Sequence, residues 1–400
     1  MIINNHKKIG EKLELFFFYK NINTGLPIWL PNGIYIYNKI KNIIRRINIS
    51  NKYLEVNTPL IGNYSLYKKS GHIEKYINNI FKILYKKKIY LKPMNCPYHC
   101  LIYKYYNNIS YKKLPIKIFE FGTVFRNEKH GELNGLFRTK MFTQDDGHIF
   151  CKNNIEIINE INKIIKIIKK LYIKFNIKEY YIQLSLRSKD SNKYIGIRKN
   201  WLKSERILLS VVKKNNIKYK IIYGEAAFYG PKIDFIIKDS INRKWQLSTI
   251  QIDYNTPKKF NIKFIDNNNK ICTPIMIHRA YIGSIERFIG ILIENSNGNL
   301  PIWLLKLQII ILPIFNYNDI YILNLYKKLK KNKIRCNIDK TKDNINIKIK
   351  KYEKLNIPII IIIGEKEILN KKIFIRQKDK KFSISLNKGY KYIINYIYNN

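Results

Sequence analysis

Residues 141–151 read MFTQDDGHIFC, an apolar run interrupted by Asp145, Asp146 and His148. Its length and its β-prone residues are typical of a strand, and yet two acids stand side by side within it. A charge placed among apolar residues is expensive unless it is paired or bound to a ligand. The stretch therefore predicts a strand of a sheet that also carries a polar site.

Strand-like runs of the same kind lie on both sides of this stretch. They are KIYLKP at 88–93, IKIFEFGTVFR at 116–126, YYIQLSL at 180–186, KIDFIIKD at 232–239 and KWQLSTIQIDY at 244–254. Apolar residues at helical spacing occupy 33–49 and, more clearly, 154–176. Because the strands seldom alternate one by one with helices, the pattern predicts an α+β domain in which helices flank a mostly antiparallel sheet.

The pattern changes from about residue 306 onward. Strand-like runs at 307–314, 334–338, 357–363 and 372–377 alternate with helical patterns at 318–332, 344–355 and 389–398. This alternation predicts a small α/β domain with a largely parallel sheet. We expect the boundary near Pro301–Leu305, which gives a first domain at 1–304 and a second at 305–400.

The chain is strongly basic, with 75 Lys and Arg against 28 Asp and Glu and a formal charge of +47. Neutralising phosphates releases counterions, so such an excess favours a polyanionic partner, nucleic acid above all. Codon usage in an A/T-rich genome is the other explanation, because it enriches Lys, Ile, Asn, Tyr and Phe together. The lysines are spread along the chain, which favours compositional bias over a dedicated basic arm.

Signals for secretion or membrane insertion are absent from the sequence. The apolar run at 15–19 is too short for a signal peptide, and the run at 357–364 fits a buried strand. The five cysteines are an odd number and are scattered, which does not indicate a disulfide framework. We expect a cytoplasmic protein with no membrane partner.

Two stretches place an arginine where an anion would stabilise it. FEFGTVFRNE at 119–128 is strand-like, so Arg126 and Glu128 project from the same face. The arginine could meet a phosphate while the acid accepts from an exocyclic amine, or the two could form a surface ion pair. SIERFIG at 284–290 places Arg287 in an apolar helical pattern, where it either binds an anion or lies on the helix surface.

Two further stretches contain groups that could line a pocket. GEAAFYGPKIDF at 224–235 is a shaped loop that holds Tyr229 and Lys232, although a plain turn would look the same. KPMNCPYHC at 92–100 offers Cys96, His99 and Cys100. Three possibilities remain open there: a local Cys/His cluster, a single metal ligand completed by distant residues, or a buried structural cysteine.

Taken in order, these stretches resemble the catalytic core of threonyl-tRNA synthetases. The resemblance rests on KPMNCP, FEFGTVFRNE, FTQDDGHIFC, GEAAFYGPKIDF, QLSTIQIDY and PIMIHRAYIGSIERFIGILIE. FEFGTVFRNE is similar to motif 2 of the class II synthetases, IGSIERFIGI to motif 3, and NKYLEVNTPLI, with Pro59, to motif 1. The C-terminal part is similar to the class IIa anticodon-binding domain, best matched at IPIIIIIGEKE.

The resemblance implies a zinc ion held by Cys96, His148 and His278. Three protein ligands leave positions open, as in a catalytic zinc site, and in the family the amino and hydroxyl groups of threonine fill them. Asp146 matches the residue that accepts from the threonine hydroxyl. An acid inside an apolar strand is then plausible, because it meets substrate beside a metal cation.

The resemblance also implies a role for each remaining motif position. Arg126 matches the contact to the α-phosphate and to the amino-acid carboxylate, and Arg287 matches the contact to the γ-phosphate. For ATP, Glu128 matches the adenine reader, Phe142 the ring that stacks on adenine, and Arg138 a further contact. Gln144, Tyr229 and Gln251 match the threonine pocket. His72 matches a histidine beside the terminal adenosine of tRNA, where it could assist transfer, and Lys232, in the same loop as Tyr229, is the other candidate catalytic residue.

The implied activity is ATP-dependent activation of L-threonine followed by transfer to tRNA(Thr), with Mg²⁺ bound to ATP. A homodimer through the motif 1 region around Pro59 is implied as well. The sequence starts where the family's catalytic core starts, so we expect no editing domain in this chain and poor discrimination against serine. Tyr98 and Ala226 stand where the family has glycine, and Tyr98 could add bulk near Cys96.

Three alternatives compete with this interpretation. Another class IIa synthetase, such as the prolyl enzyme, is disfavoured by the QDD-x-H pattern with its matching Cys and His. An inactive paralogue that only binds tRNA is disfavoured because Arg126, Glu128 and Arg287 are all present. A general basic nucleic-acid-binding protein is suggested only by the charge.

Overall fold

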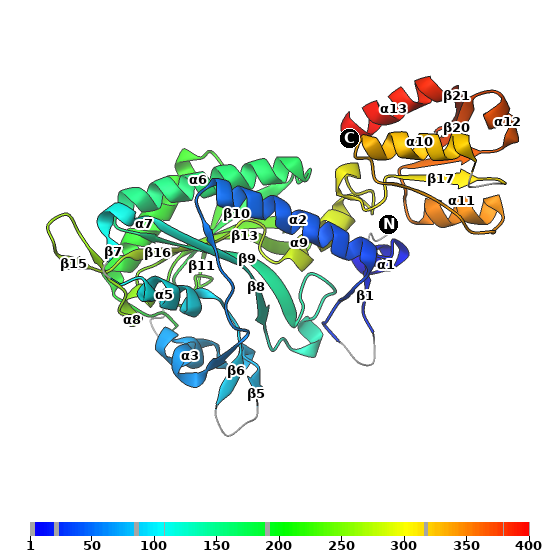
Figure 1. The fold of residues 1–400 in the computed structure, drawn as a ribbon. Coiled ribbons are helices and arrows are strands. Elements are labelled where there is room, and N and C mark those ends of the chain that lie inside the picture. The colour runs from blue at the N-terminus through cyan, green and yellow to red at the C-terminus, as the bar shows by residue number, and fades with distance from the viewer. Residues whose placement is uncertain are drawn as a thin grey trace. The chain divides into compact units, whose positions relative to one another are not determined.

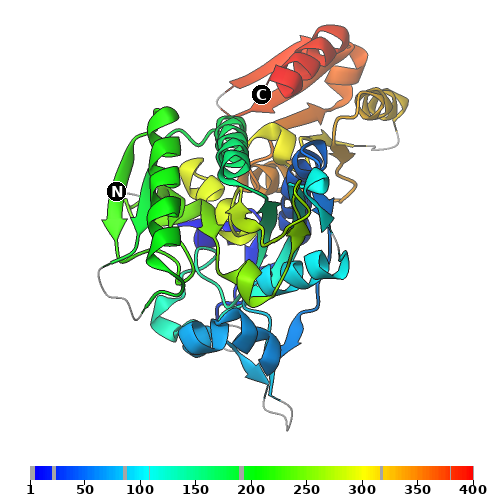
Figure 2. The same cartoon turned by 90° about the vertical axis from the view of Figure 1, so that its left-hand side faces the viewer.

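The computed structural model describes residues 5–19, 24–83, 88–107, 109–188, 193–315, 319–378 and 380–399. Two units can be distinguished among them (Figures 1 and 2). The first contains residues 40–295, 18–19 and 24–27, and the second contains 296–399 together with 5–17 and 28–39, within the described ranges. We retain the boundary between residues 304 and 305 as a proposal.

The first unit is built on an eight-stranded sheet with the order β11-β10-β12-β13-β16-β9-β8-β3. Its strands are β3 (Leu54–Glu55), β8 (Ile116–Phe125), β9 (Met141–Cys151), β10 (Tyr180–Leu186), β11 (Tyr219–Tyr223), β12 (Lys232–Lys238), β13 (Lys244–Asp253) and β16 (Ile275–Ala280). Only the outermost pairs, β10–β11 and β3–β8, are parallel. The prediction of a mostly antiparallel sheet is therefore confirmed.

Helices flank this sheet, as predicted. They are α3 (Tyr64–Ser70), α4 (His72–Tyr76), α5 (Cys96–Tyr105), α6 (Asn154–Lys174), α7 (Arg198–Lys214), α8 (Thr256–Lys259) and α9 (Ile285–Asn295). α6 contacts β9 and β16, α7 contacts β10, and α9 contacts β9 (Figure 1). The predicted helix at 154–176 is α6, which begins at an Asn153 cap and buries an isoleucine-rich stripe. α3, α4, α5, α7 and α8 were not predicted as helices.

Smaller sheets complete the first unit. One contains β4 (Ile61–Asn63), β6 (Ile89–Leu91) and β5 (Lys82–Ile83), and another contains β15 (Ile271–Cys272), β14 (Phe264–Ile265) and β7 (Ile109–Ser110). Short 3₁₀ turns lie at Ile77–Asn79, Tyr111–Lys113 and His130–Glu132. None of these short strands pairs with β9, β13 or β16, the strands that carry the polar residues.

The second unit contains a five-stranded sheet with the order β18-β17-β19-β20-β21. Its elements after residue 300 are a 3₁₀ turn (Ile302–Leu304), β17 (Ile309–Pro313), α10 (Ile320–Lys331), β18 (Cys336–Ile338), α11 (Ile345–Lys354), β19 (Ile359–Ile363), α12 (Glu365–Leu369), β20 (Lys372–Gln377), β21 (Lys380–Ser385) and α13 (Leu386–Asn399). Figure 2 shows α13, in red, lying along this sheet. The start of the helix predicted at 318–332 lies outside the described residues.

The parallel order predicted for this sheet holds for only half of it. β17 pairs in parallel with β18 and β19, whereas β20 pairs antiparallel with β19 and β21. Only two residues of the sequence separate β20 from β21, and a connection of that length can only make an antiparallel pair. β21 was not predicted, because its burial pattern is mostly exposed and it lacks a buried apolar face.

The N-terminal elements are α1 (His6–Lys12), β1 (Phe16–Phe17), β2 (Ile28–Trp29) and α2 (Pro31–Ser50). β1 and β2 form an antiparallel pair. The helix predicted at 33–49 is α2. No helix in the part of the chain that the structure describes is long and apolar enough to span a membrane.

The two adjacent acids of β9 face opposite sides of the sheet. Asp145 is fully buried and accepts from Arg279 at 2.7 Å and from the Tyr281 backbone N–H at 2.7 Å. The Arg279 guanidinium is also fully buried, lies 4.1 Å from the Tyr281 ring centroid and donates to Asn48. A Cβ at Gly147 would come within 2.4 Å of that guanidinium, so only glycine leaves room for it.

We expect Asp145→Asn to lower the free energy of unfolding by about 3–5 kcal/mol, because it leaves the Arg279 charge buried without its carboxylate. Urea denaturation followed by circular dichroism measures the change. Asp146→Asn is the matched control, since Asp146 has no arginine or lysine partner among the described residues and accepts from an amide of Asn95. Equal stabilities for the two variants would contradict this assignment.

Candidate active site

Alternation along β9 brings one polar set to the opposite face from Asp145. Gln144, Asp146 and His148 follow at intervals of two and therefore share this face. The neighbouring strand β16 pairs so that His278 stands directly opposite His148. The antiparallel register thus joins two histidines that are 130 residues apart in the sequence.

Cys96, at the first turn of α5, completes a cluster with these two histidines. One ligand atom from each of the three residues lies within 4.8 Å of the others, and all three side chains are buried. A thiol and two imidazoles are ligands that zinc prefers, and three of them leave coordination positions open. The residues predicted as metal ligands are brought together by the fold.

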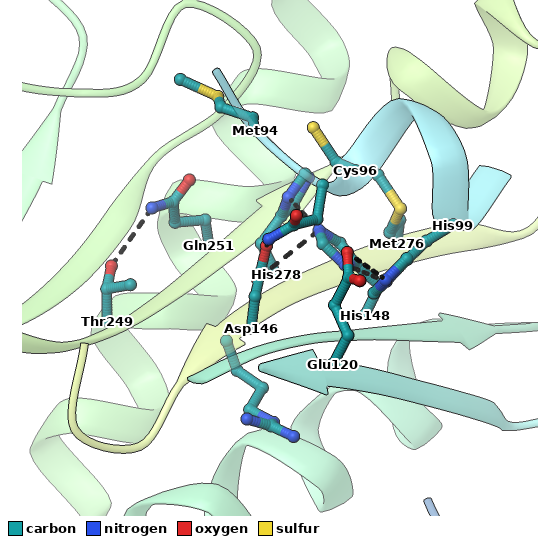
Figure 3. A network of polar contacts seen from close by, with 12 residues as sticks. Met94, Cys96, His99, Glu120, Asp146, His148, Thr249, Gln251, Met276 and His278 are labelled. Carbon is teal, nitrogen blue, oxygen red and sulfur yellow. Dashed lines mark hydrogen bonds and ion pairs between the residues drawn. The ribbon is translucent and has the colours of Figure 1, made fainter. Parts of the chain in front are cut away.

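His148 and His278 each point one ring nitrogen toward the other and the second ring nitrogen away from the cluster (Figure 3). His148 Nε2 and His278 Nδ1 face each other at 2.9 Å. Behind them, His278 Nε2 lies 3.0 Å from Asp253 Oδ2, and His148 Nδ1 lies 2.7 Å from His99 Nδ1. Partners behind the ligands orient imidazoles in protein metal sites, so the residues present fit a zinc ion.

Burial controls the ionisation of this cluster. It raises the pKa of the Cys96 thiol well above the ordinary value, and the nearby Asp146 carboxylate adds to this effect. It lowers the pKa of His148 well below the ordinary value, with further repulsion from His278. Burial also raises the pKa of Asp146. A low-dielectric pocket of this kind favours the neutral forms in the absence of a bound cation.

A pocket of about 90 Å³ opens beside the cluster. Its walls include Asp146, Tyr229, Thr249 and Gln251 as well as the three cluster residues. The Tyr229 hydroxyl donates to Gln251 at 2.5 Å, and the Gln251 amide donates to Thr249 at 3.2 Å. The pocket is small and polar, which suits a small molecule with several hydrogen-bonding groups.

A second pocket, of about 100 Å³, contains three arginines: Arg126, Arg138 and Arg287. Burial and repulsion from Arg126 and Arg138 lower the pKa of Arg287 to about 10. Arg287 donates to the carbonyls of Phe137 and Gln246 rather than to an acid. Three cations that repel one another in one pocket favour a polyanionic ligand.

Arg126 is the least satisfied of the three cations. Its Nε is buried without a hydrogen-bond partner among the described residues. Its guanidinium lies 4.9 Å from the centroid of the Phe142 ring, which holds it in the pocket. Arg138, in contrast, donates to Glu128 at 2.7 Å and to Glu132 at 3.3 Å. Glu128 is therefore engaged by Arg138 in this structure.

Two predicted residues lie next to the pockets rather than on their surfaces. Lys232 donates to Asp234 at 2.6 Å, and Asp234 accepts in turn from Thr249. His72 is buried, with Nδ1 2.7 Å from the Ser70 hydroxyl and Nε2 3.9 Å from Cys96 Sγ. Burial lowers the pKa of His72 to about 3, so its ring is neutral.

Tyr98 does not line the pocket beside the Cys/His cluster, although its position in the sequence suggested that it could add bulk there. Its hydroxyl donates to the Ile61 carbonyl at 2.5 Å, away from the cluster. A Cβ at Gly62 would meet this hydroxyl at 2.7 Å, so glycine there makes room for the tyrosine. Ala226 is buried and lines neither pocket.

Several residues of the site were given no role from the sequence, although His99 was named there as part of a possible local Cys/His cluster. Asp253 orients His278, Asn95 donates to Asp146 at 2.9 Å, and Glu120 and His99 lie behind His148. Asp253 is the last residue of β13 and stands one residue before the end of the strand predicted at 244–254, so an acid near a strand end was the available signal. The other contacts depend on how α5, with Asn95 at its N-cap and His99 in its first turns, is placed against β8 and β9, which the sequence pattern does not reveal.

Comparisons with known proteins agree with this geometry. The family model described as tRNA synthetase class II core domain (G, H, P, S and T) matches residues 81–296, and the model described as anticodon binding domain matches residues 308–395. A threonine–tRNA ligase of Azobacteroides pseudotrichonymphae genomovar. CFP2 is 43% identical over 383 residues, and one of Bacteroides fragilis (strain YCH46) is 43% identical over 379.

These alignments cover 94% of this chain in both cases, but 59% and 58% of the two relatives. The chain therefore spans just under three fifths of the length of the curated relatives it matches. Among solved structures, the RNA binding domain of threonyl-tRNA synthetase from Cryptosporidium parvum Iowa II is similar over 98% of both chains, with 34% identity and a TM-score of 0.87.

Proposed function

This chain belongs to the threonyl-tRNA synthetase family of class II tRNA synthetases, and on that premise we propose that it is a threonine–tRNA ligase. In the first step, a threonine carboxylate oxygen bonds to the α-phosphorus of ATP, and the bond to pyrophosphate breaks. In the second, a terminal ribose hydroxyl of tRNA(Thr) attacks the carbonyl carbon, and AMP leaves. No side-chain nucleophile is needed.

One observation carries this proposal. Arg126, Gln144 and Thr249 line both the pocket beside the Cys/His cluster and the pocket with three arginines. The two pockets therefore meet at a small set of shared side chains. An aminoacyl-adenylate has the matching layout, since its amino-acid part and its nucleotide part join at a phosphate–carboxyl link. Arg126 stands at the place where that link would lie.

The proposed ATP contacts follow from this placement. Arg126 binds the α-phosphate and the threonine carboxylate, and Arg287 binds the γ-phosphate. Phe142 stacks on adenine, Glu128 reads its amine, and Arg138 adds a phosphate contact after loosening from Glu128. Positioned cations stabilise the charge that develops during phosphoryl transfer, with Mg²⁺ neutralising the triphosphate.

The proposed threonine contacts lie in the neighbouring pocket. Asp146 accepts from the substrate hydroxyl, while Gln144, Tyr229 and Gln251 shape the remaining walls. Cys96, His148 and His278 would hold one zinc ion, which supplies a Lewis-acid contact for the amino and hydroxyl groups when bound. The Asp253 carboxylate keeps the His278 ring in its orientation.

Lys232 and His72 have supporting roles in this proposal. Lys232 positions Gln251 through Asp234 and Thr249, and so acts on the threonine pocket indirectly. His72, neutral at physiological pH, offers a hydrogen bond near the transfer step rather than a charge.

We also propose that the chain is a cytoplasmic homodimer. Leu54, Leu60 and Ile61 are about half exposed around Pro59, and β3 is the edge strand of the large sheet. Apolar side chains gathered at a sheet edge favour a second copy as partner. All five cysteines are free, as expected for a reducing compartment. Sedimentation at several concentrations tests the dimer, and a monomer throughout would contradict it. Cell fractionation tests the location.

The experiment that tests the function is threonine-dependent ATP–pyrophosphate exchange, with zinc measured on the same sample. We expect exchange with threonine, none with proline, and one zinc per chain. Exchange that ignores threonine, or its complete absence from a folded, zinc-loaded sample, would contradict the proposal.

The variant Arg126→Lys tests the shared position. Lysine keeps the charge but loses the planar fork that can contact two oxygens at once. Removing a positioned donor of this kind lowers the rate by about 10²–10³-fold, and we expect such a fall in the exchange rate with the melting temperature unchanged. Arg187→Lys, which alters an arginine paired with Glu205 away from both pockets, is the matched control. Normal kinetics in Arg126→Lys would remove this residue from the mechanism.

A further inference from the structure

We propose that His99 and Glu120 are positioning residues for His148, which act by fixing the tautomer of that ring and so the affinity of the cluster for its metal. The inference rests on the proposed function, since it assumes that the cluster holds zinc. It concerns residues behind the cluster that touch neither of the two pockets.

The three residues form a buried line (Figure 3). His148 Nδ1 lies 2.7 Å from His99 Nδ1, and His99 Nε2 lies 3.4 Å from Glu120 Oε1. His99 is fully buried, and the other two are each 1% exposed, so no solvent competes for these contacts. His99 Nε2 makes no hydrogen bond of regular geometry among the described residues, so its contact with Glu120 is an ion-pair contact.

Proton placement along this line follows from simple exclusion. Two ring nitrogens 2.7 Å apart can share only one proton, so one donates and the other accepts. The negative charge of the Glu120 carboxylate, 3.4 Å from His99 Nε2, favours the His99 proton on that nitrogen, which leaves His99 Nδ1 as an acceptor. His148 must then carry its proton on Nδ1. Its Nε2 lone pair is thereby free toward Cys96 and His278, as a metal ligand requires.

Glu120 is itself firmly held in the ionised form. It accepts from the Thr58 backbone N–H at 3.0 Å and from the Thr58 hydroxyl at 2.8 Å, with Lys92 Nζ at 3.4 Å. Burial alone raises the pKa of Glu120, but its contacts with His99, Lys92 and Thr58 outweigh burial and hold the pKa below its ordinary value. Both carboxylate oxygens face donors, so a neutral amide could not replace the group without a clash.

His278 shows the same arrangement in a shorter form. Its outward nitrogen meets the Asp253 carboxylate directly, at 3.0 Å. His148 lies farther from a carboxylate and reaches Glu120 through His99. Both histidine ligands are thus connected to a buried acid, directly for His278 and through His99 for His148. Acids in this position raise the basicity of ligating imidazoles.

The test measures zinc affinity by competition with a chelator, on the full chain. We expect Glu120→Gln and His99→Leu to weaken zinc binding by about 10–100-fold, as for other partners of metal ligands. His99→Gln should recover part of the affinity, because its amide can accept from His148 and donate to Glu120. Partial recovery is a signature that a purely structural role would not give.

Glu160→Gln is the matched control. Glu160 is also a buried acid with basic partners, Lys117 and Lys163, but it lies on α6 away from the cluster. Its zinc affinity should equal that of the wild type. The melting temperature of each metal-free variant shows whether it folds, and if Glu120→Gln does not fold, the comparison of His99→Leu with His99→Gln decides.

The outcomes separate the inference from its premise. Zinc affinity that is unchanged in folded His99→Leu and Glu120→Gln overturns the inference and leaves the proposed function standing. Equal losses in His99→Leu and His99→Gln overturn it as well, because tautomer control would then not distinguish them. A wild-type chain that holds no zinc refutes the proposed metal site, and the inference falls with it.

Discussion

Replacing His148 by alanine is expected to remove zinc from the purified chain and to lower threonine-dependent exchange by about 10⁴-fold or more. Alanine leaves two of the three clustered ligands, Cys96 and His278, which are too few to retain the ion. Without it, the substrate loses its contacts at both the amino and the hydroxyl group. Loss of the hydroxyl contact alone is worth about 10⁴–10⁵-fold in sites built to bind that group.

The matched control for this variant is His6→Ala, since His6 is also a buried histidine but belongs to the second unit. It should retain both zinc and exchange. Zinc content is measured by elemental analysis after dialysis, and exchange is measured on the same sample. A His148→Ala variant with full activity and no zinc would show that the cluster has another purpose.

Amino-acid selectivity should be highly uneven. Valine has the shape of threonine without the hydroxyl, so Asp146 would be left buried without the donor it is placed to meet. We expect valine activation to be about 10⁴–10⁵-fold weaker than threonine activation. Serine keeps the hydroxyl and lacks one methyl group, which is worth only about 10–200-fold.

Exchange kinetics with the three amino acids, compared as kcat/KM, measure this order. Asp146→Ala should narrow the gap between threonine and valine, because the acid that penalises valine is gone. A wild-type chain that activates valine as well as serine would mean that the small pocket recognises shape alone, and the role of Asp146 would have to be abandoned.

The strands around the site were predictable because each is a short run of apolar, β-prone residues. β9, β10, β12 and β13 all lie where the runs of apolar residues indicated. Their pairing was not predictable, since the sequence of a strand does not show which other strands lie beside it in the sheet. This is why Arg279 was missed as the partner of Asp145: the two are 134 residues apart and meet only when β16 lies beside β9.

The metal ligands illustrate the same limit from another side. Cys96, His148 and His278 come from three distant segments, and local spacing left the role of Cys96 open. Only the resemblance to a family joined them. The residues behind them, His99 and Glu120, lie within the stretches KPMNCPYHC and FEFGTVFRNE, but neither stretch predicts a contact between them, and the fold alone reveals it.

The close approach of Arg279 to Gly147 limits how this strand can change during evolution. A methyl group at Gly147 would meet the guanidinium at 2.4 Å, and removing Asp145 would leave the same buried charge without its carboxylate. A lineage could therefore alter Asp145, Gly147 or Arg279 only in concert, while each single step passes through a poorly folding intermediate. The neighbouring Asp146 is constrained instead by its proposed contact with the substrate hydroxyl. Two identical, adjacent residues are thus expected to be held by unrelated kinds of selection, one for folding and one for choosing a substrate.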